Sequence, residues 1–362
     1  MIFYISMNDE WYVRRSLRLA ARAQGMTSPN PMVGAVIVKN GEILSEDYHR
    51  KPGTLHAEAL AIATAGKEAK GSTLYVNLEP CCHTEKRTPP CTKAIIHSGI
   101  QKVVIGMTDP NPKVSGKGIA ELRDGGIDVK PGILEEEAKK LNETYAKYIT
   151  TGKPFVTLKV AMTLDGKIAT PEGRSKWITG EQARKKVHTL RSHVDAIMTA
   201  IGTVKADDPQ LTVRMKKGMS PLRIVIDPNL EVPLHAKVLR TPPPTMIVTS
   251  ERGAKSEQLE KSGIRIIHYG NKLDLGWLME TLGKMEITSV LIEGGSSLNA
   301  HALEDGIVDK VLFFIAPKIM GGRDSFPSVG GNTFRKLEDA YQLKDTKIRR
   351  VGEDFLIEGY LG

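Results

Sequence analysis

The sequence contains little cysteine and few aromatic residues: three cysteines among 362 residues, and 5% Phe, Trp and Tyr. So few cysteines exclude a disulfide-stapled extracellular scaffold. No apolar run approaches the roughly 20 residues that cross a bilayer, and residues 1–5 are apolar but lack the basic start of a signal peptide. Met7 offers a second translation start behind this short segment. These absences predict a cytoplasmic protein with no membrane partner.

The net charge is +9, yet the lysines and arginines are spread over both halves of the chain. Because aromatic residues are scarce, no basic stripe interleaved with stacking side chains is visible, and we expect no nucleic-acid partner. A general positive charge favours phosphorylated small molecules instead. A chain of 362 residues is also too long for one hydrophobic core, which predicts two domains.

His56, Cys81 and Cys91 have the residue types and the order of a hydrolytic zinc site. One imidazole and two thiolates leave a fourth coordination position for a water, whose pKa zinc lowers to about 7. Glu58, which is not a ligand, is placed to carry protons. The alanine-rich stretch 56–63 predicts a helix with His56 and Glu58 on its first turn. Cys91 opens another expected helix, where thiolate is favoured. The conjunction predicts a zinc-dependent deaminase.

The segment after Cys81 leaves two rival ligands open. Cys82 and His83 follow directly, and nine residues separate Cys81 from Cys91, whereas the general deaminase signature has two. Because adjacent side chains diverge, Cys81 and Cys82 cannot easily hold one ion. We therefore expect Cys82 to pack and His83 to line the pocket. Taken singly, each cysteine would more readily be an ordinary core residue.

The first half alternates between strand and helix patterns, which predicts a three-layer α/β/α sandwich. Its expected strands are residues 33–38, 74–77, 103–106 and 127–129, with a hairpin turn at Asn40–Gly41. Residues 134–148 have the periodicity of one helix, and a break at residues 150–154 ends it. We therefore expect a first domain over residues 1–149 and a second over residues 150–362.

The second half alternates as well. Its expected strands are residues 155–161, 196–199, 223–226, 246–249, 264–268, 290–292 and 311–315, and its expected helices are residues 180–192, 277–284 and 297–305. No Gly-x-Gly-x-x-Gly follows a strand, so a Rossmann fingerprint is missing. The strand 290–292 instead runs into Gly294–Gly295 and a helix. Backbone amides at such a helix N-terminus can hold a pyrophosphate, although glycine pairs are also common turns.

Several stretches closely resemble the bifunctional deaminase and reductase family of riboflavin biosynthesis, and the resemblance covers nearly the whole chain. They are residues 27–38, 49–58, 79–91, 159–167, 175–179, 203–209 and 293–295. The resemblance implies a cytidine-deaminase-like domain followed by a dihydrofolate-reductase-like α/β domain. It implies zinc-dependent hydrolytic deamination of 2,5-diamino-6-(5-phosphoribosylamino)pyrimidin-4-one. It then implies NADPH-dependent reduction of the ribosyl side chain of 5-amino-6-(5-phosphoribosylamino)uracil to ribityl.

The resemblance also implies roles for individual residues. The zinc ligands would be His56, Cys81 and Cys91, with the proton carrier at Glu58. The NADPH contacts would be Ala161, Trp177, Thr203, Asp207, Gly295, Ser296, Ser297, Leu298, Asn299, Ala300 and His301. The substrate contacts of the reductase would be Ser175, Arg191, Leu211, Arg214 and Glu293.

Asn30 and a group of nearby cations are further candidates for contact with the deaminase substrate. Asn30 lies in a rigid Pro-Asn-Pro turn and can hydrogen-bond the substrate, which resembles the use of that asparagine in related deaminases. A substrate phosphate needs cations, and His49 and Arg87, together with Lys51, are the nearest supply in the sequence. The alternatives are an ordinary turn residue for Asn30 and solvated loop charges for the cations, above all for Lys51.

The reduction has its own chemical demands. The guanidinium forks of Arg191 and Arg214 fit a ribose phosphate, with surface salt bridges as the alternative. Hydride reaches C1 of the sugar only after the ring opens, and a cation near the ring oxygen would assist that step. We expect Lys159 to be this catalytic residue, with Glu293 or Asp207 to orient it or to handle protons.

Two other functions stay open at this point. The zinc site alone would serve a nucleic-acid base deaminase, which would need a basic and aromatic strand-binding surface. The second half could instead only bind a nucleotide or mediate assembly. The favoured function is a two-step enzyme that acts on a phosphoribosylated pyrimidine with Zn²⁺ and NADPH, in a homo-oligomer that is a dimer or a tetramer.

Overall fold

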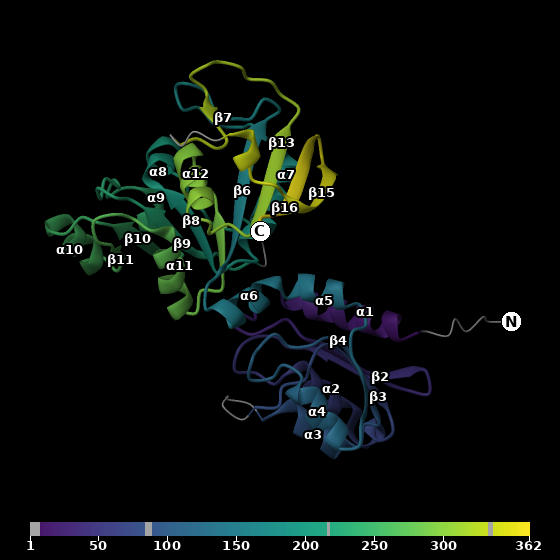
Figure 1. Cartoon of the computed structure of the whole chain (residues 1–362). Helices are drawn as coiled ribbons and strands as arrows, with labels where there is room; N and C mark the ends of the chain where they lie inside the picture. The colour runs from purple at the N-terminus through teal and green to yellow at the C-terminus, as the bar shows by residue number, and fades with distance from the viewer. Residues whose placement is uncertain (1–7, 84–88, 216–217, 332–335) are drawn as a thin grey trace. The chain divides into compact units, whose positions relative to one another are not determined.

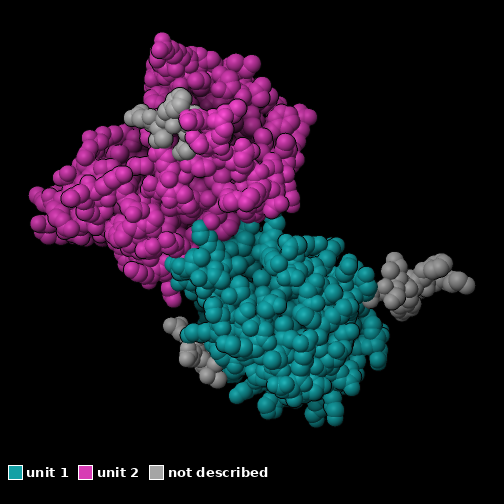
Figure 2. Space-filling view, viewed as in Figure 1, with its two compact units in different colours: residues 1–152 teal, residues 153–362 magenta. Residues whose placement is uncertain are grey.

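The computed structural model describes residues 8–83, 89–215, 218–331 and 336–362. The chain divides into two compact units, Met1–Gly152 and Lys153–Gly362, and each is described by itself (Figure 2). The division falls slightly beyond residue 149 because the last helix of the first unit continues to Thr151.

Unit 1 is built on a five-stranded sheet of order β2-β1-β3-β4-β5. The strands are β1 (Gly34–Lys39), β2 (Glu42–Tyr48), β3 (Thr73–Leu78), β4 (Lys102–Met107) and β5 (Asp128–Lys130). β1 is antiparallel to β2 and β3, whereas β3, β4 and β5 run parallel. The β1–β2 turn is the expected hairpin, since Asn40 and Gly41 have the positive φ angles, 53° and 82°, that a type I′ turn requires.

Helices cover both faces of this sheet (Figure 1). They are α1 (Asp9–Ala20), α2 (Ala57–Ala65), α3 (Cys91–Ser98), α4 (Lys117–Asp124), α5 (Glu135–Leu141) and α6 (Glu143–Thr151). α1 packs on β1 and β3 on the same face as α5, while α2, α3 and α4 form the opposite layer. The contact between α1 and β1 requires glycine at position 34, where a Cβ would lie 2.2 Å from the carbonyl oxygen of Ser16. The expected three-layer sandwich is confirmed.

The expected single helix over residues 134–148 is wrong, because α5 and α6 meet at Asn142. The Asn142 side chain accepts a hydrogen bond from Met32 N at 2.8 Å and donates one to Met32 O at 3.0 Å. Buried Asn77 donates to the same carbonyl at 2.9 Å and accepts from Gly34 N at 2.8 Å. These two asparagines hold the loop before β1. A tertiary contact thus overrides the helical periodicity.

Unit 2 contains a nine-stranded sheet of order β11-β10-β9-β8-β12-β6-β13-β16-β15. The strands are β6 (Phe155–Thr163), β8 (Ala196–Ala200), β9 (Leu222–Ile226), β10 (Thr245–Thr249), β11 (Arg265–His268), β12 (Ser289–Ile292), β13 (Lys310–Ala316), β15 (Lys344–Val351) and β16 (Asp354–Tyr360). The strands that lie from β11 through β6 to β13 in the spatial order of the sheet match the expected strands, and they run parallel to one another. The antiparallel hairpin of β15 and β16 was not expected, because β15 is almost wholly exposed and polar. A short pair of β7 (Lys167–Ala169) and β14 (Phe326–Pro327) lies apart from this sheet.

The helices of unit 2 flank the parallel strands (Figure 1). They are α7 (Glu181–Arg191), α8 (Ile201–Asp207), α9 (Lys237–Arg240), α10 (Ala254–Lys261), α11 (Leu275–Lys284) and α12 (Ser296–Glu304). Because β8, β12 and β6 are adjacent and parallel, their carboxyl ends meet at one edge, where open α/β sheets bind ligands. Within the described ranges, no helix has the length and apolar character needed to cross a membrane.

Candidate zinc centre and reductase site

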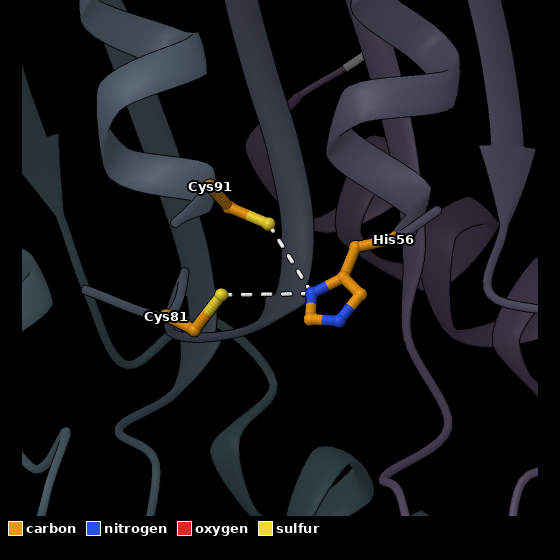
Figure 3. Close-up of side chains that lie close together, drawn as sticks. All are labelled: His56, Cys81 and Cys91. Carbon is orange, nitrogen blue, oxygen red and sulfur yellow. Dashed lines mark hydrogen bonds between the residues drawn. The ribbon is translucent and has the colours of Figure 1, made fainter. Parts of the chain in front are cut away.

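Three side chains from three segments of unit 1 converge on one point (Figure 3). His56 is the N-cap residue of α2, Cys91 is the first residue of α3, and Cys81 follows β3. The Nδ1 atom of His56 lies 3.5 Å from Cys81 Sγ and 3.3 Å from Cys91 Sγ. All three ligand atoms lie within 4.8 Å of one another.

These residues fit a zinc ion. Zinc binds sulfur at about 2.3 Å and nitrogen at about 2.0–2.1 Å, so tetrahedral ligation separates the nitrogen from each sulfur by about 3.6 Å. The observed separations of 3.3 and 3.5 Å are close to this value. A set of one histidine and two cysteines leaves one coordination position for water or substrate, which is typical of a catalytic site. Neither Cys82 nor His83 belongs to this cluster.

Glu58 lies on the first turn of α2, two residues beyond the histidine ligand, and its side chain is buried. Burial raises the pKa of Glu58, and the neighbouring Cys81 thiolate raises it further. Its Oε2 atom has no hydrogen-bond partner among the described residues. A buried carboxyl with an unpartnered oxygen beside the metal ligands is placed to exchange protons with a reacting group.

Glu79 anchors the segment that carries Cys81. Its buried carboxylate accepts three backbone hydrogen bonds, each 3.0 Å long, from Asp109 N, Gly116 N and Ile119 N. The carbonyl of Cys81 in turn accepts a 3.3 Å bond from the backbone N–H of the residue after Cys91. The two sulfur ligands therefore lie on backbone segments that are tied to each other and to the loop after β4.

Asn30 and His49 lie together near the zinc ligands. Asn30 Nδ2 is 3.1 Å from His49 Nε2, and His49 Nδ1 is 3.2 Å from the carbonyl oxygen of Leu55. A carbonyl only accepts, so Nδ1 carries the proton and Nε2 accepts from the asparagine amide. The buried His49 ring also packs edge-on against His56, with ring centroids 5.2 Å apart. A neutral imidazole that orients Asn30 fits these contacts better than a cation for phosphate. Arg87 lies outside the described residues.

Asp109 is a buried carboxyl that the sequence analysis missed. It follows β4 and accepts a 3.0 Å hydrogen bond from the hydroxyl of Tyr145. Burial raises the pKa of Asp109 to about 6, and the charges of Glu79 and Cys81 add to this rise. The available signal was its place in the sequence, a carboxylate directly after a buried parallel strand.

In unit 2, Lys159, Arg191 and Glu293 form a buried ion cluster. Lys159 Nζ lies 2.9 Å from Glu293 Oε2, and Arg191 pairs with both carboxylate oxygens at 2.6 and 3.0 Å. Burial would raise the pKa of Glu293, but the charges of Arg191 and Lys159 outweigh it and lower the pKa. The carboxylate therefore stays ionised and orients the lysine.

Arg191 is already engaged in this cluster. Its Nε and Nη2 atoms bind Glu293, and its Nη1 donates to the carbonyl of Thr212 at 3.0 Å. Arg214 is exposed, and both arginine charges lower the pKa of His188, after the larger effect of burial. The Arg191 side chain is only 14% exposed within the cluster, whereas Arg214 is exposed to solvent.

The turn before α12 has features of a nucleotide cradle. The backbone packs closely at this turn, since a Cβ at Gly294 would lie 2.9 Å from the Leu298 side chain and a Cβ at Gly295 would lie 3.6 Å from Thr203 Oγ1. The buried atoms Ser296 Oγ and Asn299 Oδ1 have no hydrogen-bond partner within the described ranges. The Ser296 hydroxyl at this helix N-terminus can donate to a phosphate of NADPH, whereas Asn299 Oδ1 can only accept, from an N–H or O–H group of the cofactor.

The other predicted cofactor and substrate residues of unit 2 are placed in different ways. Ser175 Oγ donates to Asp207 Oδ1 at 2.9 Å, so these two predicted residues lie together. Trp177 is 62% exposed, and its ring lies 4.6 Å from the guanidinium carbon of Arg184. Ala161, Leu211 and Leu298 pack in or against the apolar core, and Ala300 is buried. On α12, Ser297 and His301 are exposed.

Two family models match the chain. Residues 6–107 match the cytidine and deoxycytidylate deaminase zinc-binding region, and residues 154–357 match the RibD C-terminal domain. The riboflavin biosynthesis protein RibD of Aquifex aeolicus is 46% identical over 351 residues, which cover 96% of this chain and 97% of that protein. RibD of Escherichia coli is 42% identical over 366 residues, 96% of this chain and 98% of that protein.

Solved structures agree with these relatives. RibD of Acinetobacter baumannii superposes with a TM-score of 0.89 at 36% identity, covering 98% of this chain and 99% of that one. A diaminohydroxyphosphoribosylaminopyrimidine deaminase/5-amino-6-(5-phosphoribosylamino)uracil reductase of Thermotoga maritima gives a TM-score of 0.89 at 37% identity, with the same coverage of 98% and 99%.

The fold and the two sites define a zinc-dependent deaminase joined to a reductase in one chain. At 46% and 42% identity to full-length relatives, the chain belongs to the RibD family, the bifunctional deaminases and reductases of riboflavin biosynthesis. Its cofactors are accordingly Zn²⁺ and NADPH. The matched reductase half favours this function over a nucleic-acid base deaminase or a second half that only binds nucleotide or mediates assembly.

Proposed function

We propose that residues 1–149 deaminate 2,5-diamino-6-(5-phosphoribosylamino)pyrimidin-4-one and that residues 150–362 reduce the resulting 5-amino-6-(5-phosphoribosylamino)uracil with NADPH. The observation that carries the first activity is the convergence of His56, Cys81 and Cys91 beside the buried, unpartnered carboxyl oxygen of Glu58. The buried cluster of Lys159 and Glu293 at the carboxyl ends of the parallel strands supports the second.

In the deaminase, Glu58 is the proton carrier. His56, Cys81 and Cys91 would hold the zinc ion, which would supply a Lewis acid that lowers the pKa of a water to about 7. Glu58 accepts a proton from the attacking water as its oxygen adds to the amino-bearing ring carbon, and passes this proton to the ring nitrogen. Glu58 then takes the second proton from the added hydroxyl group and gives it to the leaving amine as the bond from carbon to nitrogen breaks. Ammonia departs and a carbonyl forms. His49 holds the Asn30 amide nitrogen, so that Asn30 Oδ1 can accept from a substrate N–H. We assign Asn30, His49 and Arg87 to the substrate site.

In the reductase, Lys159 is the catalytic residue. NADPH supplies the hydride to C1 of the ribosyl group. The bond between C1 and the ring oxygen breaks, and the Lys159 ammonium gives that oxygen its proton, which leaves a ribityl hydroxyl. Glu293 holds the ammonium at 2.9 Å and, paired with Arg191, remains a carboxylate throughout.

The remaining contacts are assigned by ligand. We assign Ser175, Arg191, Leu211, Arg214 and Glu293 to the reductase substrate. We assign Ala161, Trp177, Thr203, Asp207, Gly295, Ser296, Ser297, Leu298, Asn299, Ala300 and His301 to NADPH. The packed residues of both sets contribute shape or backbone groups, because their side chains lie in or against the apolar core.

A two-step assay with metal analysis tests the proposal. The expected result is one zinc per chain, deamination of the diaminopyrimidine, and NADPH consumption only once the deaminated product is present. Deamination without any NADPH consumption would leave unit 2 as a nucleotide-binding or assembly domain. Deamination of a tRNA or of single-stranded DNA, with no activity on the pyrimidine, would overturn the substrate assignment.

We further propose a homo-oligomer, a dimer or a tetramer, in the cytoplasm. β15 is the outer strand of the nine-stranded sheet, and it is exposed along its length with Ile348 67% exposed. An unpaired edge strand presents free backbone N–H and C=O groups with which a second copy of the chain can pair. The zinc site needs reduced thiols, which the cytoplasm maintains. Analytical ultracentrifugation of the wild-type chain tests the first point, and a monomer at micromolar concentration would refute it.

A further inference from the structure

Arg223 is a buried arginine with an unusual set of partners. It lies on β9, an inner strand of the nine-stranded sheet, and only 1% of its surface is exposed. Its guanidinium pairs with no carboxylate among the described residues; burial lowers the pKa of Arg223 to about 10. Burial of a charge without an opposite charge costs free energy of folding. We therefore expect the hydrogen bonds of this guanidinium to have a role that an apolar side chain could not fill.

Those hydrogen bonds join two segments. On one side, Nη1 donates to the carbonyl of Gln210 at 3.0 Å. On the other, Nη1 donates to Thr241 Oγ1 at 3.1 Å, and Nη2 donates to the carbonyls of Thr241 and Pro243. The guanidinium therefore links two segments through its hydrogen bonds. One is residues 207–214, which we call the substrate segment, and the other is the turn before β10.

The substrate segment needs such support. After Asp207 it has no helix or strand, and two of its non-glycine residues, Asp208 and Leu211, have positive φ angles of 40° and 52°. This region of φ is unfavourable for side chains with a Cβ, so surrounding contacts must hold it. Arg191 holds the segment from the reductase site through the carbonyl of Thr212, and Arg223 holds it from the sheet through Gln210.

We propose that Arg223 is a positioning residue of the reductase, which holds Gln210 and thereby presents Leu211 and Arg214 to the phosphoribosyl group of the substrate. The proposal rests on the proposed function, in which Leu211 and Arg214 contact that substrate. Arg223 itself, buried on β9, touches neither substrate nor NADPH. Its loss should therefore weaken substrate binding more than it slows the chemical step.

The test is a comparison of kcat and KM in Arg223→Met and Arg223→Lys. We expect Arg223→Met to raise the KM for 5-amino-6-(5-phosphoribosylamino)uracil about tenfold or more, with kcat within about threefold and deamination unchanged. Arg223→Lys keeps the charge and the fold but cannot reach both segments, because a lysine ammonium is a single point donor. It should raise KM as well, and a lysine variant with a normal KM would overturn the proposal.

A matched control separates positioning from general destabilisation. Leu259 on α10 belongs to the same apolar cluster as Leu211 and is equally buried, but it forms no hydrogen bond to the substrate segment. Leu259→Ala should lower the melting temperature without raising KM. If it raises KM as much as an Arg223 variant of the same melting temperature, Arg223 has only a structural role.

Arg214→Gln separates the positioning role of Arg223 from the substrate contacts on which that role depends. If Arg214→Gln leaves the substrate KM unchanged, the assignment of the substrate segment is wrong and the proposed contacts fail. If Arg214→Gln raises KM while both Arg223 variants leave it unchanged, the contacts stand and the positioning role of Arg223 is refuted.

Discussion

Glu58 combines burial with an unpartnered carboxyl oxygen beside the zinc ligands. Glu58→Gln preserves the size of the side chain but removes its capacity to carry a proton. We expect the variant to keep its zinc and to lose deamination by about 10²–10⁴-fold, the usual contribution of a general acid–base group. NADPH consumption with the deaminated substrate should persist. Measured deamination at the wild-type rate would refute the proton-carrier role.

Cys91 belongs to the candidate zinc cluster and Cys82 does not, so the two thiols form a matched pair of sites for substitution. Cys91 Sγ lies 3.3 Å from His56 Nδ1, whereas the contact recorded for Cys82 Sγ is with the carbonyl of Lys113, at 4.0 Å. Cys91→Ser should lower the zinc content per chain, because a serine oxygen is a poor replacement for a thiolate ligand. Cys82→Ser should retain zinc. Metal analysis that gives the reverse result would exchange the two ligand assignments.

Substitution of Lys159 does not leave the buried carboxylate of Glu293 without a positively charged partner. Glu293 keeps its two contacts with Arg191, so the fold of unit 2 should tolerate Lys159→Ala. We expect reduction to fall by at least about 10²-fold while deamination is unaffected. Lys205→Ala, which removes an exposed ion pair with Glu231, serves as the control and should leave both activities intact. Equal loss of both activities in Lys159→Ala would point to misfolding.

At the scale of elements, the C-terminal hairpin supports α7. Asp354, buried at the start of β16, accepts a 2.7 Å hydrogen bond from the N–H of Gly180, the N-cap residue of α7. Asp354→Ala should lower the free energy of unfolding of unit 2 by about 1 kcal/mol, because it removes an acceptor and a negative charge from a helix N-terminus. Glu353→Ala, at an exposed neighbour, should have little effect. Denaturant midpoints of the reductase activity measure both, and equal midpoints would contradict the capping role.

The sequence predicts the helices and strands whose pattern of apolar residues follows directly from their burial. The inner strands β1, β3 and β4 are apolar along nearly their whole length, because helices cover both faces of the sheet. β15 has no such pattern, since most of its residues face solvent and its place is set by pairing with β16. The break at Asn142 is also invisible in the periodicity, because it depends on a contact with Met32 far away in the sequence.

The two candidate sites also differ in how much of each can be predicted from the sequence. His56, Cys81 and Cys91 lie within one short stretch and have a characteristic order, so the sequence alone brings them together as ligands. The pairing of Glu293 with both Lys159 and Arg191 needs three separate elements to meet at one edge of the sheet. The sequence offers each charge but not their distances. The sequence therefore does not distinguish an arginine that is free to bind a phosphate from an arginine that is already paired with a carboxylate.

At the scale of the whole molecule, each unit has its own core and its own candidate site, with the zinc ligands in unit 1 and the ion cluster in unit 2. Zinc removal is therefore expected to separate the two activities. A chelator at neutral pH should abolish deamination, since the thiolates and the imidazole lose the ion that they hold. Reduction of pre-deaminated substrate should continue, because the one metal-binding cluster among the residues that the structure describes lies in unit 1.

The two activities must be measured on the same chelated sample, and added Zn²⁺ should restore deamination without changing the rate of NADPH consumption. The control is Glu58→Gln treated in the same way, in which Zn²⁺ returns to the protein but deamination does not recover. Loss of reduction in parallel with zinc would mean that the fold or activity of unit 2 depends on unit 1. We instead expect the two activities to respond separately to metal, because the two units have separate cores. A bound ion stabilises only the structure that holds it.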